Sequence, residues 1–109
     1  MANDEWFTRN AGEPYSYARQ KLWEALQALV SSQRMSRRLG GALASLAQLD
    51  VETQVPPEMR EEFVGLMAAL GSRLDRSDPQ WTTVKSTAPK SDQMAEQVLG
   101  LFVRTMGGL

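Results

Sequence analysis

The stretch from Tyr15 to Val30 constrains the fold of this chain more than any other part of its sequence. Apolar side chains recur there at steps of three and four residues, which places them on one face of a helix. Arg19 and Lys21 stand among the polar side chains of the remaining surface. A helix with one apolar face needs a partner surface, so the stretch predicts a helix that packs on others. Its apolar positions are Tyr15, Ala18, Leu22, Ala25, Leu26 and Leu29.

Three further stretches repeat this spacing, and no stretch shows the alternation of a strand. Pro57 favours a helix start, and Gly71 and Gly107 favour helix ends. We therefore predict an all-α fold, a small four-helix bundle over residues 14–109, with a polar N-terminal arm over 1–13 and a long loop before the last helix. The predicted helices cover about 14–31, 33–48, 57–74 and 92–106.

Local signals inside these helices lead to further expectations. Ser31 or Ser32 is the expected N-cap of the second helix, and Ser91 that of the last. Gly40 and Gly41 lie inside the second helix, where each costs about 1 kcal/mol relative to Ala. Such a pair indicates either another segment packed closely against the helix or a kink in it.

The composition argues against an enzyme. The 109 residues include neither cysteine nor histidine, so the chain lacks the commonest general base, zinc ligand and thiol nucleophile. The pairs of neighbouring acidic residues do not have the spacing of a metal-binding loop. We therefore expect no cofactor, metal or small-molecule substrate. The first residues lack an apolar run and no stretch is long enough to span a membrane, so we expect a cytoplasmic location.

Charge is balanced overall, with 12 basic and 13 acidic residues, but is divided along the chain. The segment 15–47 holds five basic residues and one acid, whereas the segment 50–66 holds five acids and one base. We interpret the two segments as neighbours that neutralise each other.

Several local patterns resemble those of a family of small bacterial helical proteins of unknown function. They are Tyr17-Ala18-Arg19 with Lys21-Leu22, Arg38-Leu39, Pro56-Pro57-Glu58-Met59-Arg60-Glu61-Glu62-Phe63, Thr82 to Thr87, and Ala95-Glu96-Gln97-Val98-Leu99. The patterns are helix-packing motifs that span about 15–106. The resemblance implies an all-helical protein and no particular activity.

Function is therefore expected to lie in binding rather than catalysis. Six methionines and three tryptophans suit an adaptable interface, and we predict a protein-binding or self-associating module, such as an accessory, antitoxin-like or inhibitor protein. The candidate partner-binding residues are Arg19, Trp23, Val30, Arg34, Arg37, Arg38 and Trp81.

Trp23 and Val30 carry the self-association hypothesis. They share one flank of the first helix with Arg19 and Leu26, beside the face centred on Leu22. If the neighbouring helices cover only that centre, the flank is left as an apolar strip that a homodimer would bury. The open alternative is that the arm covers it through Trp6 and Phe7.

A basic cluster supports a second hypothesis, DNA binding. Arg34, Arg37 and Arg38 stand at the N-terminal end of the second helix, after a short serine turn. A helix-turn-helix protein places basic residues at this position to contact phosphates and base edges. The balanced net charge and the absence of glycine in the turn weigh against this alternative, as does the usual role of arginine clusters in surface pairing.

Overall fold

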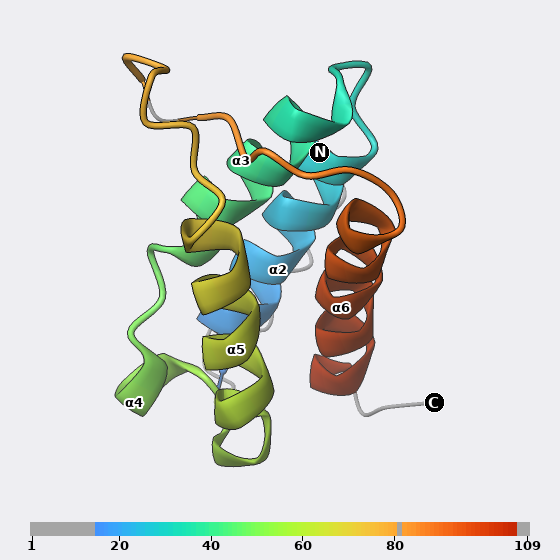
Figure 1. Cartoon of the computed structure of the whole chain (residues 1–109). Coiled ribbons are helices and arrows are strands. Elements are labelled where there is room, and N and C mark those ends of the chain that lie inside the picture. Colours follow the sequence, from blue (N-terminus) through green and yellow to red (C-terminus); the bar gives the residue numbers. More distant parts are fainter. Residues whose placement is uncertain (1–14, 81, 107–109) are drawn as a thin grey trace.

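A computed structural model describes residues 15–80 and 82–106 (Figure 1). The arm predicted over 1–13 lies outside the described residues, as does Trp81. Within the described ranges the chain forms five α-helices and one turn of 3-10 helix. Their bounds are α2 Ser16–Leu29, α3 Met35–Leu46, α4 Val51–Gln54, η1 Pro57–Met59, α5 Arg60–Gly71 and α6 Lys90–Thr105.

The all-α class predicted from the sequence is confirmed, because the described part of the chain is mostly helical and contains no strand. The closest approach to a sheet is an isolated antiparallel bridge between Leu74 and Val84. No helix in the described ranges combines the length and the apolar character needed to cross a membrane.

The stretch between α3 and α5 falls between two of the predicted helices, and it contains the single-turn helix α4. Asp50 starts this turn, since its carboxylate accepts hydrogen bonds from the Glu52 N–H at 3.3 Å and the Thr53 hydroxyl at 2.7 Å. Short polar side chains at an N-cap satisfy N–H groups that the helix itself leaves unpaired.

Both serine N-caps expected from the sequence are wrong. α3 begins later than predicted, after Arg34, whose backbone is extended and whose side chain makes no capping bond. Ser31 instead remains attached to α2, because its N–H donates to the Ala28 carbonyl at 3.2 Å. α6 begins at Lys90 after Pro89, whose backbone angles are helical, so Ser91 falls inside the helix and is buried.

The four longer helices enclose one apolar core. α2 and α6 lie side by side and run in opposite directions, while α5 packs against α3 and α6 (Figure 1). The apolar spacing that begins at Tyr15 does predict the buried line of α2. The largest fully buried side chains are Phe63, Leu22, Leu39, Leu46, Leu66, Leu70, Met94, Leu101, Val55, Val84 and Val98.

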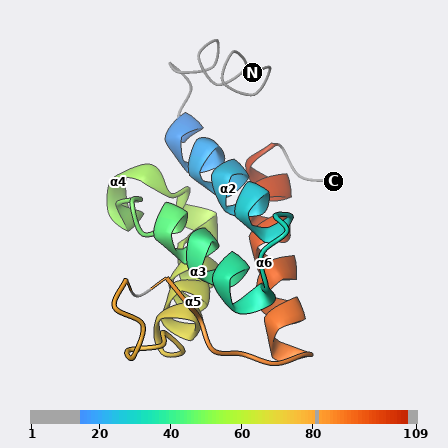
Figure 2. The same ribbon diagram turned by 90° about the horizontal axis from the view of Figure 1, so that it is seen from above.

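Residues 82–84, in the long connection from α5 to α6, pass beside α3 (Figure 2). Val84 anchors this connection, with a fully buried side chain and an N–H that donates to the Ser36 carbonyl at 2.9 Å. Gly40 permits the approach, because a Cβ at this position would stand 1.7 Å from the Thr82 carbonyl oxygen. The expectation that another segment presses against the two glycines is confirmed, and α3 continues unbroken through them.

Substitution of Gly40 by Ala is expected to destabilise the fold by about 1–3 kcal/mol, because the new methyl group must displace backbone. Gly100→Ala in α6 is the matched control, since a Cβ there meets no atom within 4 Å. That change should stabilise the protein by about 0.5–1 kcal/mol through helix propensity alone. Urea denaturation measures both, and equal shifts of the two midpoints in the stabilising direction would contradict the close contact.

Candidate interaction surfaces

The three arginines of the basic cluster do not have equivalent surroundings. Arg34 and Arg37 are exposed, whereas Arg38 is partly buried and its guanidinium donates to the Leu29 carbonyl at 3.2 Å. A cation at this position also suits the partial negative charge at the C-terminal end of α2. Arg38 therefore stabilises the connection between α2 and α3. Arg34 and Arg37 are the exposed basic residues of the cluster.

The interpretation that the basic and acidic segments neutralise each other fails for the residues whose ion pairs are seen. Glu62 of α5 pairs with Arg104 of α6, which lies outside both segments. Lys21 was expected on the polar face but is 8% exposed, and it pairs with Glu24 of its own helix at 3.1 Å. Its ammonium also lies 5.3 Å from the centre of the Tyr17 ring, a distance at which the ring attracts a cation.

Trp23, a candidate residue of the first helix, packs against α6. Its ring centre lies 5.7 Å from that of Phe102, with the ring planes 39° apart. The side chain is half-buried, and its indole nitrogen is buried with no hydrogen-bond partner among the described residues. Arg19 and Leu26 on the same flank are also half-buried, whereas Val30 is 81% exposed. α6 thus covers part of the predicted strip.

α6 contributes an apolar line that the sequence analysis missed. Its buried line contains Met94, Val98 and Leu101, and a second line continues around the helix toward α2. Leu99 and Met106 in the second line are 50% and 51% exposed. The sequence does contain the signal for this second line, since its apolar residues follow at steps of three and four. They lie beside the more strongly apolar line that is buried. The second line consists of Ala95, Leu99, Phe102 and Met106.

The two flanks meet at the contact between Trp23 and Phe102 and form one surface, which we call the α2–α6 face. On the α2 side, every residue of this flank except Arg19 is uncharged. The face consists of Trp23, Leu26 and Val30 with the four residues of the second α6 line.

A second surface was not expected at all. The end of α3, α4 and the middle of α5 enclose a groove of about 450 Å³ that is lined mainly by apolar side chains, among them Leu49, Val51, Phe63, Val64 and Met67. Val64 is 49% exposed within it. We call this the α3–α4–α5 groove. The sequence did not predict this groove, because one of its walls is α4, a single turn that lies between two predicted helices.

A third depression, of about 420 Å³, lies between α5 and α6 and is more polar. Its lining includes Glu62, Lys90 and Glu96, and Glu62 is occupied by the ion pair with Arg104. Within the described ranges, no three histidine, cysteine or carboxylate side chains come together as metal ligands would.

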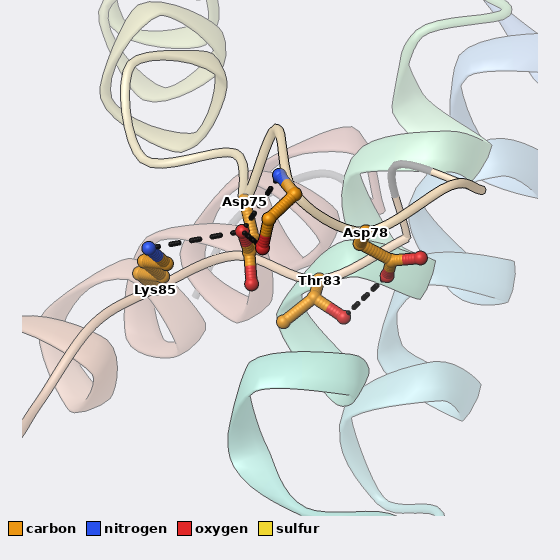
Figure 3. A network of polar contacts seen from close by, with 5 residues as sticks. Asp75, Asp78, Thr83 and Lys85 are labelled. Carbon is orange, nitrogen blue, oxygen red and sulfur yellow. Dashed lines mark hydrogen bonds and ion pairs between the residues drawn. The ribbon is translucent and has the colours of Figure 1, made fainter.

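The loop before α6 carries a network of hydrogen bonds around two aspartates (Figure 3). Asp75 accepts bonds from the hydroxyl and the N–H of Ser77, and these bonds lower the pKa of Asp75 below its ordinary value. Asp78 accepts from the Gln80 N–H at 2.9 Å and from the Thr83 hydroxyl at 2.7 Å, and both bonds lower the pKa of Asp78. The network fixes the loop that packs on Gly40.

The lowered pKa values set the direction of a pH effect. A carboxylate whose pKa is lower in the folded state than in the unfolded chain stabilises the fold above the unfolded value of 3.8, and this contribution is lost as the pH falls through the folded value. Asp78→Ala should therefore be less stable than the wild type at pH 7, and the difference should shrink below about pH 4.

Urea denaturation at pH 7 and at about pH 3 measures this difference. Glu96→Gln in the middle of α6 is the control, because it removes a carboxylate that makes no hydrogen bond to another described residue. A gap between wild type and Asp78→Ala that stays constant over this range would contradict the role of the ionised carboxylate.

Comparison with known proteins assigns no family to the chain. No protein-family model matches it, and the comparisons with curated proteins and with solved structures found no match. The resemblance to small bacterial helical proteins stays a prediction. Function must therefore be argued from the α2–α6 face, the α3–α4–α5 groove and the exposed arginines themselves.

Proposed function

We propose that this chain is a non-enzymatic, cytoplasmic protein-interaction module, built as a four-helix bundle, that forms a homodimer through the α2–α6 face. The observation that carries the proposal is the second apolar line of α6, in which Leu99 and Met106 are half-exposed on either side of Phe102, the residue that contacts Trp23. Contiguous apolar surface on a small domain tends to be an interface, and a two-fold dimer is the commonest way to bury it.

The distribution of charge supports a second copy as the partner. The centre of the α2–α6 face is uncharged, as the centres of protein interfaces tend to be, so two copies can meet there without repulsion between like charges. α2 and α6 run in opposite directions (Figure 1), so Arg19 in the first turn of α2 and Asp92 in the first turn of α6 lie toward opposite ends of the face. A two-fold axis across the helices would bring Arg19 of one copy toward Asp92 of its partner.

Leu99→Lys is expected to weaken the dimer by at least about tenfold, because a charge at the centre of the interface would be buried without a partner. Analytical ultracentrifugation should show wild type as a dimer at high micromolar concentration and Leu99→Lys shifted toward the 12.1 kDa monomer, with unchanged helicity. Val64→Lys is the matched control, since Val64 is 49% exposed and Leu99 50%.

A wild-type protein that sediments as a monomer at high micromolar concentration would end the dimer proposal. Trp23→Ala is a less specific test than Leu99→Lys. Because Trp23 packs on Phe102, its removal would cost stability of the monomer as well as the proposed contact.

DNA binding remains the alternative function, and the exposure of Arg34 and Arg37 at the start of α3 is the observation in its favour. Arg38 supports it less, since its guanidinium is bonded to the Leu29 carbonyl. The loop 82–84 also lies along one side of α3, where Thr82 meets Gly40 and Val84 bonds to Ser36. If α3 were a recognition helix, it would have to contact DNA with the side that this loop does not cover.

A salt titration of binding to random duplex DNA distinguishes the two functions. If α3 binds DNA, the logarithm of the affinity should fall with that of the salt concentration by about 0.9 per phosphate contacted. The double variant Arg34→Gln and Arg37→Gln should then reduce this slope. The homodimer proposal instead predicts no duplex binding at low salt and the same dimer affinity in the double variant.

A further inference from the structure

The α3–α4–α5 groove is a preformed surface. Arg60 fixes its α4 side, because its guanidinium donates to the carbonyl of Val55 at 2.9 Å and to that of Glu52 at 2.8 Å. Gln54 closes the same turn by accepting from the Asp50 N–H at 2.7 Å. These bonds hold α4 against the start of α5, so the groove does not depend on a ligand for its shape.

The surface of the groove is apolar at its centre and acidic at its edge. None of its lining residues is charged, and Val64 and Ala68 are exposed within it. Three exposed acids adjoin the lining: Asp50 and Glu52 stand on either side of Val51, and Glu61 lies one helical turn before Val64. Arg60, the basic residue of this segment, is bonded to the two carbonyl oxygens.

Charge complementarity decides what kind of partner fits. The same groove of a second copy would bring acids against acids, which costs free energy. A partner with an apolar stripe flanked by Lys or Arg would bury its stripe on Val64 and Met67 and place its cations against the acids. The groove thus differs from the α2–α6 face, whose uncharged centre suits a second copy.

Backbone chemistry decides the conformation of that partner. The lining residues come from helices and their ends, where the structure offers no strand edge to an extended peptide. A helical segment satisfies its own backbone hydrogen bonds and can present apolar anchors at steps of three and four residues. We therefore propose that the α3–α4–α5 groove binds a basic amphipathic helix of another protein.

The test uses the full chain and two synthetic peptides of 18 residues, each labelled with a fluorophore. One has a leucine face flanked by lysines, and the other has the same leucine face flanked by glutamates. Fluorescence anisotropy should show that the Leu/Lys peptide binds wild type at least about tenfold more tightly than the Leu/Glu peptide, because the acids favour only the first. Equal affinities would overturn the proposal.

Matched variants locate the binding site. Val64→Lys should weaken binding of the Leu/Lys peptide by at least about tenfold, and Leu99→Lys, which adds the same charge at equal exposure, should change it less than about twofold. Ala68→Lys provides a second variant in the groove if Val64→Lys loses helicity in circular dichroism. Equal loss in the groove variants and in Leu99→Lys would show binding by net charge alone and overturn the proposal.

The same variants separate this inference from the homodimer proposal, on which it does not depend. Leu99→Lys should disrupt the dimer and spare peptide binding, whereas Val64→Lys should do the reverse. Glu61→Gln should weaken the Leu/Lys peptide and make it less sensitive to salt, because one acid at the edge is lost. An unchanged salt dependence in Glu61→Gln would contradict the role of the acidic edge in binding and overturn the proposal.

Discussion

The contact between Gly40 and the backbone at Thr82 is the constraint on which the rest of the structure depends. It lets residues 82–84 lie against α3 without a side chain between the two backbones. Val84 can then reach the core, and the chain can return to start α6 beside α2. Both the shared core and the α2–α6 face require that return. The two aspartate networks maintain the loop in the conformation that makes the contact.

Much of this fold could be predicted from the sequence, because apolar spacing reports directly on which side of a helix is buried. The line through Leu22 and Leu29 faces the core as its period indicates. The serine N-caps were predicted wrongly, because the position of a cap depends on where the chain turns. Ser31 instead remains bonded to the end of α2, and Ser91 lies inside α6. A glycine pair could signal a close approach, but only the structure identifies Thr82 as its neighbour.

The candidate surfaces were predicted less well than the fold. The flank of Trp23 was recognised because a large apolar residue stood outside the main line. The line through Leu99 was overlooked, since an apolar residue beside a buried line reads as core. The α3–α4–α5 groove could not be predicted from the sequence, because Val51 and Val64 are separated along the chain and are brought to one surface only by the fold. The unequal surroundings of the three arginines likewise arise from a tertiary contact, that of Arg38 with the end of α2.

The α2–α6 face and the α3–α4–α5 groove share no residue. If both proposals hold, pairing of two copies leaves both grooves open, and the assembled protein is bivalent. A target that carries two basic helices on one chain, or that is itself a dimer, would be held at both ends once the first helix has bound. The second association is then intramolecular, and its strength depends on the spacing of the two grooves and the length of the target's linker rather than on any new contact. Modest affinity at each groove would thereby suffice for tight and selective capture of paired targets.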